Sequence, residues 1–335
     1  MDEARKRWDS LAKPLGSLGL LEDAVVKIAA LTDNADVRLN NRALLVLCAD
    51  NGVVARGVTQ SDSSVTTAVA RALGAGESTV CHMARVANCR VVPVDMGILD
   101  FHGGAGVLDR RVRNGTADIT QGPTMSRAEC IRAIETGVEL VREQKAAGAD
   151  ILATGEMGIG NTTTSSAVAS VLLGRTPAEV TGRGAGLSDA GLARKITAVE
   201  RAIQVNRPDP ANPIDVLSKV GGLDLAGLCG VFLGGAECRI PILMDGFISA
   251  VAALCAIRLN PEAGRAMLAS HVSAEPAGRL VLDELGLKPL ITAGMRLGEG
   301  SGAVAALPLL DIALAVYHSG HTFDRMGMEP YIPQN

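Results

Sequence analysis

The hydrophobic and polar positions of this chain follow two alternating patterns. Largely apolar runs at residues 42–49, 90–94 and 150–153 are each followed by polar residues or glycine, which is typical of buried parallel strands. Apolar residues recur instead at helical spacing over residues 127–141, where Ser126 is a candidate N-cap. Strands that alternate with helices predict an α/β fold with a doubly wound, mostly parallel sheet.

Further apolar segments continue this pattern toward the C-terminus. Residues 242–248 and 267–271 predict two more strand-to-helix junctions. Residues 230–234 fit either a strand or a helical segment, because a short apolar run has no decisive periodicity.

The two ends of the chain have a different character from its middle. The first 35 residues are helix-like, and residues 303–316 form an apolar helical run before an irregular tail. We therefore expect two domains. A large catalytic α/β domain spans residues 36–302, and a smaller helical domain is formed by residues 1–35 together with residues 303–335.

Composition narrows the functional class. Of 335 residues, 47% are hydrophobic but only 2% aromatic, so the core must consist mainly of aliphatic side chains. A net charge of −4 without a long basic run argues against nucleic acid as a partner, and no apolar run reaches the ~18–20 residues of a membrane span. The seven cysteines stand singly without a Cys-x-x-Cys pair, which favours buried free thiols in a reducing cytoplasm over disulfides or zinc.

Polar side chains stand at the ends of the expected strands. Asp50, Asp95, Glu156, Asp245 and Ser270 follow or terminate successive apolar runs. Because the carboxyl ends of parallel strands lie at one edge of a sheet, where ligands bind in open α/β folds, we expect these residues to converge on an active site.

The segment 154–164 is the strongest candidate for ligand binding. It places Glu156 beside a glycine-rich turn that leads from a strand into a helix, a geometry that presents backbone N–H groups to an anion. Asn161 and the threonines after it add side-chain donors or caps. The spacing matches neither Gly-x-Gly-x-x-Gly nor the P-loop, so an ordinary glycine-rich turn remains the alternative.

Two more glycine-rich segments carry candidate chemistry. Residues 181–189 contain Arg183 and precede Lys195, which suits a phosphate, although a flexible surface loop has the same composition. In residues 295–302 a single carboxylate, Glu299, stands between glycines before an apolar helix. Partial burial would raise its pKa and make it a general base, while a structural role near a helix N-terminus is equally compatible.

Five motifs together resemble one family, the nicotinate-nucleotide:dimethylbenzimidazole phosphoribosyltransferases. In chain order they are KPLGSLGLLE (13–22), GEMGIGNTT (155–163), GRGAGLSD (182–189), SHVSAEP (270–276) and RLGEGSG (296–302). The resemblance implies transfer of phosphoribose from nicotinate mononucleotide to the lower-ligand base of a cobamide, which gives the α-riboside phosphate and nicotinate. It also implies a dimer with each active site near the subunit interface, and no cofactor.

The resemblance implies a role for individual residues. Glu299 is the catalytic base, Glu156 lines the pocket for the aromatic base, and Ser270 and Ser273 belong to the nicotinate end. Phosphate and ribose are expected at Gly158, Gly160, Asn161, Thr162, Gly182, Arg183, Gly184 and Lys195. No metal is required, because the departing pyridinium already carries positive charge.

One region departs from the family pattern. Asn51 stands in place of the usual His, Asp62 in place of Pro, and Ala68-Val69 where a Gln is expected. Ser61, Asn51, Ala68 and Val69 are expected in the base pocket, so its preference can differ from dimethylbenzimidazole.

Several alternatives therefore stay open at this stage. The chain can be a paralogue specific for phenols or other bases, or a non-catalytic nucleotide-binding subunit paired with an active paralogue. A generic phosphotransferase is disfavoured, because the P-loop Lys and a carboxylate cluster for Mg²⁺ are absent from the sequence.

Overall fold

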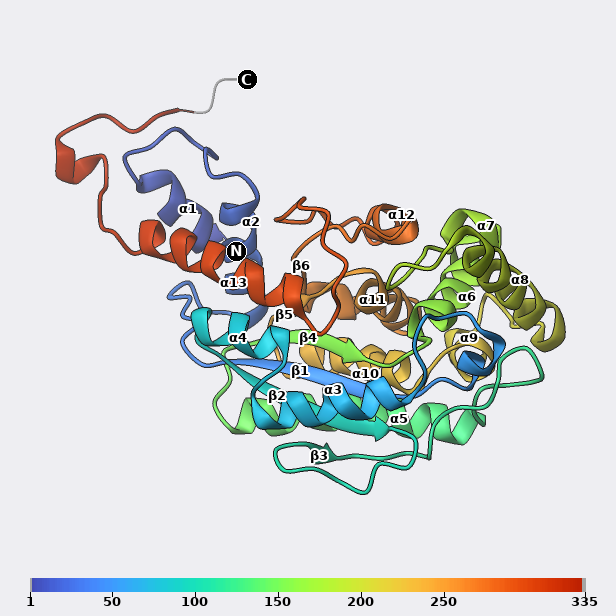
Figure 1. The fold of residues 1–335 in the computed structure, drawn as a ribbon. Coiled ribbons are helices and arrows are strands. Elements are labelled where there is room, and N and C mark those ends of the chain that lie inside the picture. The colour runs from blue at the N-terminus through green and yellow to red at the C-terminus, as the bar shows by residue number, and fades with distance from the viewer. Residues whose placement is uncertain (1, 333–335) are drawn as a thin grey trace.

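The computed structural model describes residues 2–332 and contains one six-stranded parallel sheet (Figure 1). The strand order is β3-β2-β1-β4-β5-β6, the doubly wound arrangement that the sequence predicts. The strands are β1 (Arg42–Ala49), β2 (Cys89–Gly97), β3 (Leu108–Asp109), β4 (Ile151–Met157), β5 (Ile242–Met244) and β6 (Met267–Ala269).

Helices occupy most of the remaining chain. They are α1 (Asp2–Ser10), α2 (Leu20–Thr32), α3 (Ser64–Ala75), α4 (Thr79–Val86), α5 (Arg127–Ala146), α6 (Asn161–Leu173), α7 (Pro177–Val180), α8 (Asp189–Asn206), α9 (Pro213–Val220), α10 (Leu223–Glu237), α11 (Phe247–Leu259), α12 (Ala277–Glu284) and α13 (Ser301–Tyr317). Ser126 caps α5 through a capping box with Glu129, as its sequence pattern indicates. The ambiguous residues 230–234 lie inside α10. Among the described helices, none combines the length and apolar character that a membrane span requires.

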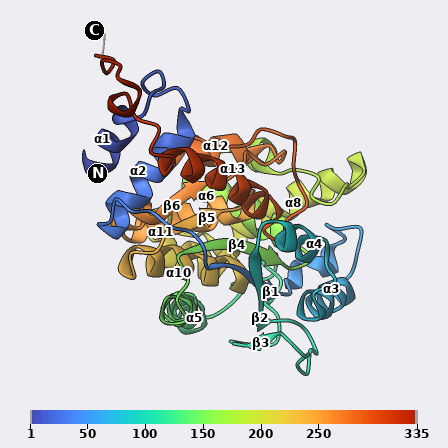
Figure 2. The same cartoon turned by 90° about the vertical axis from the view of Figure 1, so that its left-hand side faces the viewer.

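Both faces of the sheet are covered by helices. Along β1, Leu45 and Leu47 pack with α5, α10 and α11, whereas Leu44 and Val46 pack with α2, α3, α4 and α13. Successive side chains of a strand point to opposite faces, so one continuous apolar run supplies two hydrophobic cores. Figure 2 shows α5 and α10 on one side of the strands and α13 on the other.

The two ends of the chain pack against each other, as Figures 1 and 2 both show. The rings of Trp8 and Tyr317 lie 5.0 Å apart, and the Ala12 N–H donates to the His321 carbonyl at 2.8 Å. Helix α13 also contacts the sheet, because Val304 and Leu307 share a core with residues of β1. The division into two domains stays a prediction of the sequence.

Helices α5 and α10 approach closely because glycines face each other at their crossing. An added Cβ at Gly230 would lie 1.9 Å from the Ile134 carbonyl oxygen, and one at Gly137 would lie 2.0 Å from the Gly227 carbonyl oxygen. Side chains at either position would push the two helices apart.

We predict that Gly230→Ala lowers the free energy of unfolding by about 1–3 kcal/mol or more, because its methyl group meets rigid backbone. Gly122→Ala is the matched control, since an added Cβ there meets nothing within 4 Å. Denaturant unfolding of both variants measures the difference. Equal stability of the two variants would contradict this account of the helix crossing.

Candidate functional site

A cavity lies at the carboxyl ends of the strands, where the strand order reverses between β1 and β4. This is the position at which open α/β sheets bind ligands. Its walls come from residues 58–61, the turn after β4, the loop 183–187, the segments after β5 and β6, and residues 296–299.

The structure brings most of the predicted site residues to this cavity. Those that line it are Ser61, Glu156, Gly158, Gly160, Asn161, Thr162, Arg183, Gly184, Lys195, Ser273 and Glu299. Segments from all parts of the chain therefore meet at one place, as convergence at the strand ends requires.

Five predicted site residues are not among those that line the cavity. Asn51 is buried, donates to the Ile159 carbonyl in the turn before α6 at 3.4 Å, and accepts from Thr164 Oγ1 of α6 at 3.5 Å. Ala68 is exposed on α3, and Val69 packs partly against the core. Ser270 is buried beside His271, and Gly182 contributes its carbonyl to Lys195.

Glu156 ends β4 as a buried carboxyl group. The Asn161 side-chain amide, at the start of α6, donates a hydrogen bond to its Oε2. Burial, together with the negative charges of Asp224 and Asp245, raises the pKa of Glu156 to about 8. At neutral pH this group is therefore mostly protonated in the unliganded protein.

Lys195 is a buried ammonium group whose partners are uncharged. Its Nζ donates to Thr162 Oγ1 at 2.8 Å and to the Gly182 carbonyl at 3.0 Å, while only 1% of the residue is exposed. Burial lowers its pKa to about 8, partly offset by the charge of Glu275. Since no carboxylate of residues 2–332 forms an ion pair with it, an anionic ligand would supply the missing negative charge.

The backbone of the turn between β4 and α6 lies very close to the backbone at the end of β1. An added Cβ at Gly158 would lie 2.1 Å from the Ala49 carbonyl oxygen, and Gly160 has a φ of +92°. The N-terminus of α6 thus borders the cavity through Gly160, Asn161 and Thr162. Arg183, by contrast, is engaged within its own loop, where it donates to the Leu187 carbonyl at 2.8 Å and pairs with Asp189.

Glu299 lies in a backbone turn of three residues with positive φ values, which also borders the cavity. Its φ is +59°, and the flanking Gly298 and Gly300 have φ values of +85° and +88°. Its N–H donates to the Glu156 carbonyl at 3.2 Å, so the two glutamates are adjacent through the backbone. Its Oε2 accepts from the Val80 N–H at 3.4 Å, at the start of α4.

Several other residues that line the cavity were not predicted from the sequence as site residues. His271, Glu275 and Arg296 lie within motifs that carry the family resemblance, so their motif membership was the available signal. Asp245 was expected at the strand ends without a role, and Phe247 opens the helix that follows it.

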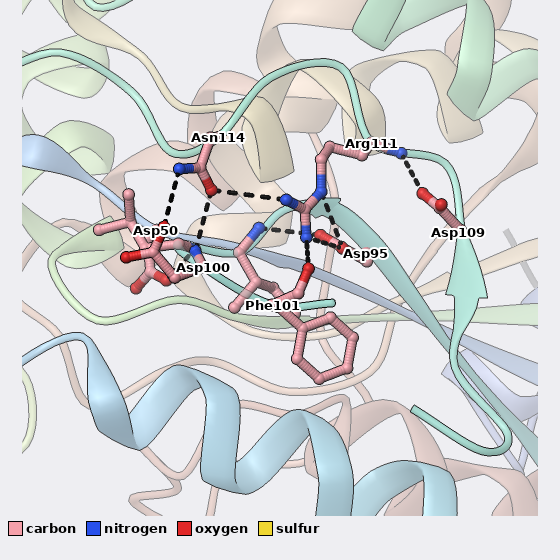
Figure 3. A network of polar contacts seen from close by, with 9 residues as sticks. Asp50, Asp95, Asp100, Phe101, Asp109, Arg111 and Asn114 are labelled. Carbon is pink, nitrogen blue, oxygen red and sulfur yellow. Dashed lines mark hydrogen bonds and ion pairs between the residues drawn. The ribbon is translucent and has the colours of Figure 1, made fainter. Parts of the chain in front are cut away.

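The expected convergence at the strand ends is only partly correct. Glu156 and Asp245 line the cavity, whereas Asp50 and Asp95 hold the chain that follows β2 (Figure 3). Asp95 accepts from the Ile98 N–H at 2.8 Å and pairs with Arg111 at 2.8 Å, and Asp50 accepts from the Leu99 N–H at 2.8 Å. Unpaired backbone donors close to these strand ends recruit both carboxylates for structural contacts.

The positions of the His, Cys, Asp and Glu side chains that the structure describes show neither a candidate metal site nor a disulfide. Within residues 2–332, no three His, Cys, Asp or Glu side chains are grouped closely enough to hold a metal ion. Six of the seven cysteines are buried, and all seven are free thiols.

Comparison with known proteins identifies the family. A family model described as phosphoribosyltransferase matches residues 1–328. The chain belongs to this phosphoribosyltransferase family. It is 48% identical over 334 residues to the nicotinate-nucleotide–dimethylbenzimidazole phosphoribosyltransferase of Acetivibrio thermocellus, covering 100% of this chain and 95% of that protein. The corresponding enzyme of Clostridium acetobutylicum is 43% identical over 333 residues, covering 99% and 95%.

A solved structure of this phosphoribosyltransferase family has the same fold. The crystal structure of CobT from Thermus thermophilus superimposes with a TM-score of 0.93 at 40% identity, covering 98% of each chain. Family membership makes this chain a glycosyltransferase, and the cavity at its strand ends is its candidate active site.

We predict that Glu156→Gln makes the unliganded phosphoribosyltransferase more stable than wild type as pH rises from about 5 to 8. The folded-state pKa of Glu156 lies above the unfolded value, so the native state binds more protons within this interval. The contribution of Glu156 to wild-type stability therefore falls with rising pH, by at most about 1.4 kcal/mol per pH unit, and glutamine removes this contribution. Denaturant unfolding at several pH values measures the gap. Parallel curves for both proteins would contradict the prediction.

Proposed function

We propose that this chain transfers phosphoribose from nicotinate mononucleotide to an aromatic lower-ligand base of a cobamide. The products are the α-riboside phosphate and nicotinate. The observation that carries the proposal is one cavity in which a buried lysine without an anionic partner faces the same space as two adjacent glutamates. A relative that is 48% identical to this chain bears the corresponding enzyme name.

The phosphate end of the substrate is assigned to Lys195 and the N-terminus of α6. The ammonium of Lys195, with Thr162 and Gly184 beside it, supplies charge, and the backbone of Gly158 and Gly160 supplies donors. Ribose is placed next to this group, near Asn161. Ser273 and the buried Ser270 are assigned to the nicotinate end, where the resemblance puts them.

The chemical step needs one base and no acid. Nicotinate leaves as a neutral ring nitrogen, because the bound pyridinium is already cationic. The incoming benzimidazole loses its N–H proton to Glu299 while its other nitrogen attacks the anomeric carbon from the opposite face, which converts a β- into an α-linkage. Glu156, with its raised pKa, lines the base pocket as a mostly neutral hydrogen-bonding group.

The structure bears on the choice of incoming base. Asn51, Ala68 and Val69, which depart from the family pattern, do not line the cavity, while residues 58–61 do. These departures therefore provide little reason to expect a pocket for phenols, and a dimethylbenzimidazole-type base is the proposed acceptor. Both glutamates lie in the cavity, so a non-catalytic nucleotide-binding subunit is not favoured either.

We further propose a cytoplasmic homodimer, as the family resemblance implies. Association with an identical chain is preferred to pairing with a paralogue, because this chain carries both glutamates and the buried lysine itself.

We predict that Glu299→Gln lowers kcat by about 10²-fold to 10⁴-fold, the usual contribution of a general base. The KM for nicotinate mononucleotide should change little, because Lys195 and the α6 N-terminus are untouched. Glu200→Gln, exposed on α8, is the control. Near-normal turnover of Glu299→Gln would exclude its role as the base.

Nicotinate release by the purified wild-type protein tests the function itself. Nicotinate mononucleotide is offered with 5,6-dimethylbenzimidazole, adenine or phenol in separate reactions, and we expect the fastest release with the benzimidazole. Fastest release with phenol would identify a phenol-specific paralogue. No release with any acceptor would contradict the proposed transferase activity.

A further inference from the structure

Asp245 is a buried carboxylate, and both of its oxygens accept hydrogen bonds from backbone N–H groups. Its Oδ1 accepts from the Gly302 N–H at 2.8 Å and the Ala303 N–H at 3.2 Å, and its Oδ2 accepts from the Gly300 N–H at 3.3 Å. These donors belong to the first turn of α13 and to the residue before it. Only 4% of Asp245 is exposed, although it borders the cavity.

The backbone that Asp245 holds is the turn that carries Glu299. Gly298, Glu299 and Gly300 all have positive φ values, and only the glycines adopt this region without strain. A non-glycine residue in this conformation is strained, and it persists only where its surroundings hold it. Contacts that hold the turn are therefore expected. Asp245 supplies one of them directly, to the Gly300 N–H, and fixes the first turn of α13 that follows through Gly302 and Ala303.

Strand β4 anchors both partners of this contact. The Asp245 N–H donates to Thr154 Oγ1 at 3.0 Å, and the Glu299 N–H donates to the Glu156 carbonyl at 3.2 Å. An added Cβ at Gly155, between those two β4 residues, would lie 2.6 Å from the Glu299 carbonyl oxygen. The turn is thus clamped between the end of β4 and the Asp245 carboxylate.

We infer that Asp245 is a positioning residue for the base, holding the left-handed turn that presents Glu299 to the cavity. Its oxygens accept from three backbone N–H groups, so it acts through Glu299 and has little capacity left for substrate. The adjacent His271, whose Nδ1 lies 3.8 Å from Asp245 Oδ1, packs against Gly302 and limits movement of the carboxylate. This inference rests on the proposed role of Glu299.

Asp95 provides a matched control. It too is a buried carboxylate at the end of a strand, where it accepts from the Ile98 N–H at 2.8 Å and pairs with Arg111 (Figure 3). It does not border the cavity or contact the Glu299 turn. Both Asp95→Asn and Asp245→Asn therefore remove a buried carboxylate. Only Asp245→Asn is expected to displace Glu299.

The test compares Asp245→Asn and Asp95→Asn, each made in the wild type and in Glu299→Gln. Unfolding temperature, kcat and the KM for nicotinate mononucleotide are measured for all. We expect Asp245→Asn to lower kcat at least about tenfold, with KM for the mononucleotide within about threefold, because the phosphate end is untouched. In the Glu299→Gln background the same substitution should change kcat little, since the residue it positions no longer acts as a base.

Two results would overturn the inference. One is an equal loss of kcat in Asp245→Asn and Asp95→Asn, and the other is an undiminished effect of Asp245→Asn in the Glu299→Gln background. Wild-type turnover is measured first, so failure of the proposed function is recognised separately.

A second variant covers the case in which Asp245→Asn does not fold. Ala303→Pro removes one of the three donors, the N–H of the third residue of α13, which has no intrahelical partner. We expect kcat to fall about fivefold, the factor that corresponds to one ordinary hydrogen bond. A folded Ala303→Pro with unchanged kcat would also contradict the inference.

Discussion

Parallel pairing of β4 with β1 determines where every part of the candidate site lies. The register places Glu156 beside Leu47 and Met157 beside Cys48, so the two strands end nearly level with each other. The turn after β4 therefore packs directly on the end of β1, where Gly158 approaches the Ala49 carbonyl so closely that a side chain would not fit. Helix α6 begins at this point and directs its N-terminus into the cavity.

Two buried ionisable groups at this crevice are perturbed in opposite senses. Burial favours the neutral carboxyl of Glu156 and the neutral amine of Lys195, and both have pKa values of about 8. They do not form a mutual ion pair, because Lys195 donates to Thr162 and the Gly182 carbonyl while Glu156 accepts from Asn161. A substrate with a phosphate at one end and a cationic ring at the other fits this arrangement. Its phosphate would favour the charged form of Lys195, and its ring would favour the charged form of Glu156.

The sequence was sufficient for the fold but only in part for the site. Strand β1 is buried on both faces and is therefore a continuous aliphatic run. Such a run can be recognised in the sequence without knowing any tertiary contact. Residues 230–234 were ambiguous because α10 is buried on nearly all sides, so its apolar residues show no helical period. The two-residue strand β3 is too short to leave a recognisable pattern.

The sequence indicates which residues line the cavity more reliably where backbone geometry requires a glycine than where a side chain can adopt either of two directions. Glu156, Lys195 and Glu299, which lie in or shortly after glycine motifs, all line one cavity, while their roles stay predictions. Asn51 does not line the cavity, because a residue that follows a strand can point into the crevice or bond to a neighbouring segment, and it bonds to the turn before α6. The choice depends on the Ile159 carbonyl beside it, which is far away along the chain.

Helix α13 joins two regions that are otherwise far apart. Its first turn begins two residues after Glu299, and the ring of its last residue, Tyr317, contacts the ring of Trp8 in a tilted arrangement among the packed chain ends. This helix of 17 residues is about 25 Å long, and it has Pro308 inside it. The packed chain ends and the wall of the cavity therefore share one structural element, so the position of the first turn of α13 depends on contacts at both of its ends.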